Sequence, residues 1–329
     1  MFPLTLVMTW NLPLPISPLF NVFLPLIESR FAAAKAGAGV SVADLALQIE
    51  EVPLGKGNAR AEFMVIDPAG PVRITWNGIA SLWAFSQGAA RLARRMFEGK
   101  RNKMDRLEID ADHELEKGLD CLELARRFCS QDIPSQVASL EYWPAWAARI
   151  DPSPPAGSDD ELGLKFFTWA LDWILRHEIA HVQLRHAARQ KNEFLSHQDC
   201  ELEADLEATK WLKGGLQAAP NRAVGEKPDK AELQLERQAI ANGLGLIWVA
   251  LFEHDQSRIS AEYPPVAERL FKCLDVFKLR QDSAAAEILS DIIQVWIAPE
   301  ESFKSSELSH TAASIFDEAL FRLHRHLAT

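Results

Sequence analysis

Five consecutive residues carry the clearest chemical signal in the chain, His177-Glu178-Ile179-Ala180-His181. Residues four apart on an α-helix share a face, so His177 and His181 are placed to direct two imidazole nitrogens at one metal ion. Glu178 borders the same face without having to be a ligand, which suits a general base for a metal-activated water. This H-E-x-x-H arrangement predicts a Zn²⁺-dependent hydrolase.

The residues before the motif support this interpretation. Residues 166–176 contain no Gly or Pro and are strongly apolar, which is typical of a buried helix leading into a site. With 9 His in 329 residues, a chance match to the five letters is on the order of a few per cent. The helical setting makes an accidental match less probable still.

A catalytic zinc site needs a third protein ligand, and the chain offers two candidates. His186 lies five residues beyond His181, and a turn of about 100° per residue places it off the ligand face of a continuing helix. We interpret His186 as a polar residue at the helix end, near the negative end of the helix dipole. Glu201 is the better candidate, because its carboxylate would complete a His₂Glu set and leave a fourth position for water.

Glu201 belongs to a second helical run, residues 199–212, which carries further carboxylates. Asp205 lies four residues after Glu201 on the same face and is placed to hold a ligand histidine by its other ring nitrogen. Glu203 points about 160° away from Glu201 and is the weaker ligand candidate. The alternative interpretation is that the acidic residues of this run form only a solvated face.

Together these residues resemble the gluzincin pattern, in which a Glu on a second helix follows the H-E-x-x-H motif as third ligand. Tyr263-Pro264-Pro265, followed by Arg269, is similar to a Pro-Pro-x-x-x-Arg segment of several such peptidases, which often carry His where this chain has Tyr263. The length and the long N-terminal half look most like the Lit-like phage-exclusion peptidase family. The resemblance covers residues 161–270.

The resemblance implies a zinc endopeptidase with a protein or peptide substrate. Within the Lit-like family it implies site-specific cleavage of a host translation elongation factor during phage infection. Tyr263 is a candidate donor to the anionic intermediate, and its alternative role is packing under the Pro264-Pro265 turn. We expect Arg269 to be a buried partner for an acidic side chain such as Asp205.

Composition points to a soluble cytoplasmic protein. The net charge of −11 argues against a nucleic-acid-binding surface, which is ordinarily basic. The four cysteines form no C-x-x-C pair and fit free thiols in a reducing compartment. The first 27 residues lack charged side chains, but prolines interrupt them and no Lys or Arg precedes them, so we expect neither a membrane helix nor a signal peptide.

The expected fold is mainly α, with a small β element in the N-terminal half and a zincin-like helical catalytic core. We expect an N-terminal α+β lobe at 1–150, a linker at 151–160 and the helical peptidase core at 161–329. A further strand at Tyr142–Ile150 would offer an edge for a substrate backbone. The expected hairpin strands are Ala61–Ile66 and Val72–Trp76, and the expected helices include Pro25–Ala36, Ile79–Phe97, Glu114–Phe128 and Lys230–Glu253.

An alternative function is a non-catalytic helical interaction protein with a structural or vestigial zinc site. A His₂Glu set with an open position is unusual for a structural site, which favours the peptidase. Metal content and peptidase activity together separate the two functions.

Overall fold

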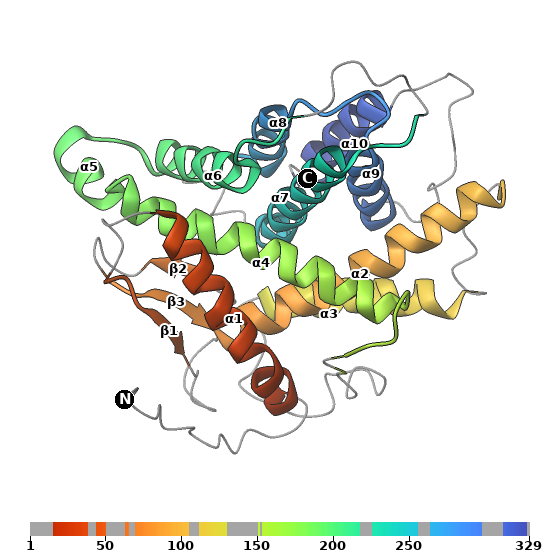
Figure 1. Ribbon diagram of the computed structural model, residues 1–329, viewed down its shortest axis with the longest axis horizontal. Coiled ribbons are helices and arrows are strands. Elements are labelled where there is room, and N and C mark those ends of the chain that lie inside the picture. The colour runs from red at the N-terminus through yellow and green to blue at the C-terminus, as the bar shows by residue number, and fades with distance from the viewer. Residues whose placement is uncertain are drawn as a thin grey trace.

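The computed structural model describes residues 16–38, 44–50, 63–65, 70–104, 112–129, 151, 153–217, 226–255, 264–297 and 312–327. Within them the fold is mainly α with a small sheet in the N-terminal half, which confirms the predicted class (Figure 1). The helices are α1 (Ile16–Ala38), α2 (Trp76–Arg101), α3 (His113–Cys129), α4 (Asp159–Gln183), α5 (His186–Glu193), α6 (His197–Lys213), α7 (Lys230–Asp255), α8 (Val266–Phe277), α9 (Ala284–Ile297) and α10 (Ala312–Leu327). The strands are β1 (Leu47–Glu50), β2 (Phe63–Val65) and β3 (Val72–Thr75).

The described strands form one sheet in the order β1-β3-β2. β2 and β3 pair antiparallel, with Phe63 opposite Ile74, so the predicted hairpin is confirmed. The sequence does not predict β1, which runs parallel to β3 with Leu47 opposite Val72. The expected edge strand at Tyr142–Ile150 lies outside the described residues.

Helix α4 is the central element of the molecule. It packs against α1, α2, α6 and α7 (Figure 1). Phe167, Leu171 and Leu175 are each fully buried along one side of it and Trp173 is buried on another, and such a broad apolar surface is typical of a core helix. This confirms the buried helix predicted ahead of the H-E-x-x-H motif, whose two histidines lie in the last two turns of α4.

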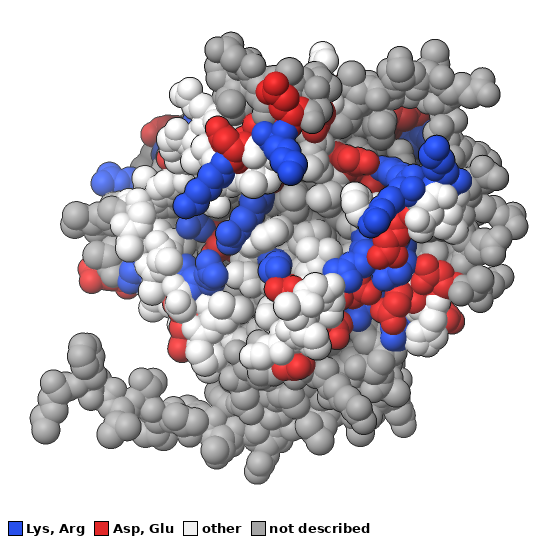
Figure 2. All heavy atoms as spheres, turned by 45° about the vertical axis from the view of Figure 1, so that its right-hand side comes forward, with Lys and Arg blue, Asp and Glu red and all other residues white. Residues whose placement is uncertain are grey.

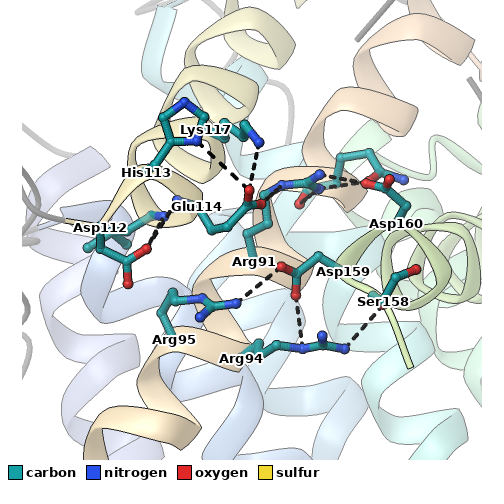
Figure 3. A network of polar contacts seen from close by, with 12 residues as sticks. Arg91, Arg94, Arg95, Asp112, His113, Glu114, Lys117, Ser158, Asp159 and Asp160 are labelled. Atoms are coloured by element: carbon teal, nitrogen blue, oxygen red, sulfur yellow. Dashed lines mark hydrogen bonds and ion pairs between the residues drawn. The ribbon is translucent and has the colours of Figure 1, made fainter. Parts of the chain in front are cut away.

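Charged side chains fix the N-terminal end of α4 (Figure 3). Ser158 caps the helix by accepting a hydrogen bond from the backbone N–H of Glu161 at 3.1 Å. Acidic residues in a first helical turn are also stabilised by the helix dipole. Three arginines of α2 bind the first turn of α4 and the start of α3: Arg94 and Arg95 pair with Asp159, and Arg91 pairs with Asp160 and Glu114.

Helix α1 differs from its expected form. The sequence predicted a helix that begins at Pro25, whereas α1 begins at Ile16 and contains Pro25 in its interior. An interior proline removes a backbone donor and crowds the preceding turn. Pro25 is exposed, while Phe23 and Ile27 are buried and the Phe23 ring lies 4.9 Å from the ring of Phe167. The apolar contact with α4 therefore outweighs the local cost of the proline.

One hydrophobic cluster draws on both halves of the chain. It includes Phe85 and Phe128 from α2 and α3 together with Trp173, Leu244 and Leu289 from α4, α7 and α9. The proposed division at residues 151–160 stays a prediction. In the structure, helix α4, which follows this segment, shares one hydrophobic core with α2 and α3, which precede it.

The surface carries both basic and acidic side chains. On the face shown in Figure 2, basic side chains are interspersed with acidic ones. Ion pairs also join helices far apart in sequence: Lys100 of α2 binds Asp291 of α9 at 2.6 Å. Among the described residues, every helix is too short or too polar to span a bilayer.

Gly245→Ala should lower the free energy of unfolding by about 1–3 kcal/mol, the usual cost of overpacking a core. A Cβ at this position of α7 would lie 2.4 Å from Cε3 of Trp173 on α4. Urea denaturation measures the change. Gly37→Ala on α1 is the matched control, since its Cβ would meet its nearest neighbour at 3.9 Å, an ordinary van der Waals contact. Similar effects from the two substitutions would contradict this account of the α4–α7 contact.

Candidate metal centre

Close packing of α6 against α4 builds the site. Ala204 and Ala208 are fully buried, and such small side chains let two helix backbones approach closely. Ser196 caps α6 by accepting a hydrogen bond from the backbone N–H of Asp199 at 3.1 Å. The cap fixes where α6 begins, and so which face of α6 meets α4.

Three side chains converge between these helices. His177 Nε2 lies 3.1 Å from His181 Nε2. Glu201 contacts both rings, with Oε2 at 3.4 Å from His177 Nε2 and Oε1 at 3.5 Å from His181 Nε2. These three residues form a group that could hold a metal ion, and they are the three that the sequence predicts as ligands.

The spacing of the three donors fits a metal ion. In a tetrahedral zinc site with bonds of about 2.0–2.1 Å, neighbouring ligand atoms lie about 3.3–3.4 Å apart. The two imidazole nitrogens lie 3.1 Å apart, and each lies 3.4 or 3.5 Å from a different oxygen of the Glu201 carboxylate, so every contact is close to this value. Two imidazoles and a carboxylate are also a donor set typical of catalytic zinc.

Asp205 and Arg269 lie directly behind His177. Asp205 Oδ1 lies 2.9 Å from His177 Nδ1, a distance at which a carboxylate can orient a ligand histidine. Arg269 of α8 donates to both oxygens of Asp205, at 2.6 and 2.8 Å, and to Glu201 at 3.3 Å. Arg269 thus takes the buried position, paired with Asp205, that the sequence predicts for it.

The acidic residues of α6 are therefore not simply a solvated face. Asp205 is fully buried and the Glu201 side chain is only 15% exposed. Burial raises the pKa of Glu201, but His177, His181 and Arg269 outweigh it and hold that pKa well below its usual range. Burial also raises the pKa of Asp205, and Arg269 and His177 reverse that effect. Both carboxylates are therefore negatively charged at neutral pH.

The two histidines differ in charge. Burial lowers the pKa of His177, but Asp205 and Glu201 outweigh it and raise that pKa to about 10. Burial and then the positive charge of His177 lower the pKa of His181 to about 3. In the metal-free protein the histidine pair accordingly carries one positive charge, on His177.

Two predicted functional residues stand apart from the three-ligand group. Glu178 is buried beside His177, with 7% of its surface exposed, and its role as general base stays a prediction. Tyr263 lies outside the described residues. Pro264, the next residue, is buried and lies two residues before the start of α8.

His186 and Glu203 make contacts beside the candidate metal centre that the sequence does not predict. Helix α4 ends at Gln183, and Arg185 adopts the left-handed conformation with φ 55° and ψ 42°. This reversal turns His186, the first residue of α5, back toward the site, where its Nδ1 lies 2.8 Å from His181 Nδ1. On its other side, His186 Nε2 lies 3.3 Å from Glu203 Oε2. His186 thus lies just beyond the end of α4, as expected of a polar residue at the helix end, but it is buried there, with only 3% of its surface exposed.

Comparison with known proteins supplies the family. The sequence profile of the peptidase U49 family matches residues 72–289. The chain belongs to the peptidase U49 family. The match spans most of α2 to α9 and includes every residue of the candidate metal centre, so this member of the peptidase U49 family is a hydrolase of peptide bonds that acts on protein substrates.

A curated relative agrees with the family match. The chain is 27% identical over 267 residues to the cell death peptidase of Escherichia coli (strain K12), across 78% of this chain and 86% of the relative. This confirms the predicted resemblance to Lit-like peptidases. No solved structure is significantly similar to the chain.

Asp205→Ala should lower the free energy of unfolding of the metal-free protein by about 3–5 kcal/mol, because it leaves a buried guanidinium without its main counter-charge. The Arg269 side chain is only 3% exposed. Chemical denaturation in the presence of a chelator measures this. Glu207→Ala on the same helix is the control, since the Glu207 side chain is 32% exposed. Equal destabilisation by the two substitutions would mean that net charge, and not the buried pair, matters.

Metal binding should release about one proton at neutral pH, because the metal displaces the proton held on His177, whose pKa is raised to about 10. Affinity should therefore rise about tenfold per pH unit between about pH 6.5 and 8. Calorimetry in buffers with different ionisation enthalpies counts the protons. Affinity that stays constant over this range would show that the metal-free site carries no proton.

Proposed function

We propose that this chain is a zinc-dependent endopeptidase, with His177, His181 and Glu201 as ligands. The observation that carries the proposal is the convergence of these donors at zinc-like spacing, backed by Asp205 and Arg269. Membership of a peptidase family supplies the reaction class.

The metal and the protein have separate tasks in the proposed reaction. When bound, zinc supplies Lewis acidity to a water molecule and to the substrate carbonyl. Glu201 and the two imidazoles would hold the ion. Asp205 fixes His177 with Nδ1 protonated and Nε2 directed at the site, as the 2.9 Å contact supports.

Glu178 is the proposed general base. It accepts a proton from the attacking water and then delivers it to the leaving amine. Its burial beside His177 supports this role, because a carboxylate sheltered from bulk solvent exchanges protons selectively with a bound water. Tyr263 remains our candidate donor to the anionic intermediate, because it immediately precedes the buried Pro264 just before the start of α8.

The proposed substrate is a host translation elongation factor cleaved at a single site, as the Lit-like resemblance implies. A cytoplasmic location follows from such a substrate. Incubating purified host elongation factors with the protein and sequencing new N-termini tests this. A single new N-terminus, absent when Glu178→Gln replaces the parent, would support the proposal. Intact factors alongside cleavage of another protein would contradict the substrate but not the reaction.

Glu178→Gln should retain zinc and lower peptidase turnover by about 10²–10⁴-fold, since an amide cannot accept the proton. Glu201→Ala should lose zinc, because two remaining ligands hold the ion poorly against chelators. Metal analysis after dialysis and a cleavage assay give the two readouts.

Glu207→Gln is the control for both substitutions and should retain metal and turnover. Full zinc occupancy in Glu201→Ala would contradict the ligand assignment. Unchanged turnover in Glu178→Gln would contradict the base. Zinc binding in the parent without cleavage of any protein would favour the alternative, an interaction protein with an inert zinc site.

A further inference from the structure

A chain of polar contacts leads from the second ligand histidine to the surface. His181 Nδ1 contacts His186 Nδ1 at 2.8 Å, and His186 Nε2 contacts Glu203 Oε2 at 3.3 Å. Arg189 then donates to both oxygens of Glu203, at 2.5 and 3.2 Å. The His186 side chain is 4% exposed, whereas those of Arg189 and Glu203 are 28% and 39% exposed. The chain therefore runs from the candidate metal centre outward through α5 and α6.

The contacts allow one arrangement of protons when both imidazoles are neutral. His181 directs Nε2 at the other ligands, so its Nδ1 carries the hydrogen and donates. His186 Nδ1 must then accept, which places the hydrogen of His186 on Nε2. That N–H faces the carboxylate of Glu203. His186 thus fixes both the tautomer and the ring orientation of His181.

The two ligand histidines are supported in related but unequal ways. Behind His177 stands a carboxylate bound by a guanidinium, Asp205 with Arg269. Behind His181 stands another such pair, Glu203 with Arg189, but a neutral imidazole is inserted between the pair and the ligand. His181 therefore receives an oriented acceptor without a full negative charge next to its ring.

We infer that His186 is a positioning residue for the metal ligand His181, held in place by the Glu203–Arg189 ion pair. The inference rests on the proposed metal site and adds residues from α5 to it. His186 is not itself a fourth ligand, because its contact is with Nδ1 of His181, on the ring edge that faces away from the other ligands. Short helix α5 is thereby tied to the affinity of the site for metal.

Zinc affinity and the visible spectrum of the Co²⁺-substituted protein test the inference. His186→Phe keeps a ring of similar size but removes the acceptor, so zinc affinity, measured by competition with a chromophoric chelator, should fall by about 10–100-fold. The Co²⁺ spectrum should change as His181 reorients. His186→Asn places a carbonyl oxygen at the position of Nδ1 in the side chain and should restore most of the affinity and the parent spectrum.

Matched controls separate this role from a general effect of histidine or charge. His197→Phe, at an exposed residue of α6 that contacts Gln190, should leave affinity and spectrum unchanged. Glu203→Ala should weaken zinc binding several-fold, whereas Glu207→Ala on the same helix should not. Because Glu203 lies at the surface, its replacement keeps the test available if His186→Phe fails to fold.

The outcomes that overturn the inference differ from those that overturn the proposed function. Parent affinity and spectrum in His186→Phe would overturn the positioning role, as would equal weakening by His186→Phe and His186→Asn. Complete loss of zinc in His186→Phe, matching His181→Ala, would make His186 a ligand and also overturn it. Zinc binding by His181→Ala as tight as by the parent would instead overturn the metal site itself.

Discussion

The buried guanidinium of Arg269 is the interaction on which the candidate site depends. Glu201 and Asp205 both face the interior, and removing two carboxylates from water is costly unless a counter-charge is buried with them. Arg269 binds both, and it is itself almost fully enclosed. It comes from α8, outside the two helices that carry the predicted ligands. The ligand face of α6 can therefore be buried only once α8 has packed against it.

The buried carboxylates are already paired with positive charges before any metal binds. The carboxylates of Glu201 and Asp205 carry two negative charges, which Arg269 and the proton on His177 together balance. A divalent cation bound here would replace that proton and change the local charge by about one unit. The donor atoms of the three predicted ligands thus already lie close together. Little rearrangement of the protein is needed to accept an ion.

Helical periodicity predicted much of the core of the site. The four-residue spacings His177 to His181 and Glu201 to Asp205 needed only regular helices, and α4 and α6 are regular over those residues. Apolar runs likewise predicted α2, α3 and α7, with ends displaced by a few residues. What periodicity could not give was pairing between distant segments. The parallel contact of β1 with β3 depends on the tertiary fold, and no local pattern encodes it.

The position of His186 escaped prediction for a different reason. Reversals of the chain are usually marked by Gly or Asn, which tolerate positive φ, whereas here Arg185 adopts that conformation. Helical periodicity alone extends α4 through His186, and this places the imidazole ring away from the face that carries His177 and His181. Pro25 produced the opposite error: the sequence suggested a helix start, but packing of α1 on α4 carries the helix through it.

The backbone conformations at the two ends of α5 make this helix unstable on its own. It has 8 residues and is bounded by Arg185 and Phe194, both left-handed. A helix shorter than about 12 residues does not persist alone in water, and each left-handed non-glycine residue costs about 1 kcal/mol or more. Order in α5 is therefore supplied by its contacts, of which the one to His181 reaches the candidate metal centre. Ion binding at the candidate metal centre and ordering of α5 would be thermodynamically linked. If ordering of α5 raised the affinity for the ion by some factor, ion binding would raise the equilibrium constant for ordering of α5 by the same factor. A molecule that engaged α5 from outside would thus change metal occupancy without touching a ligand.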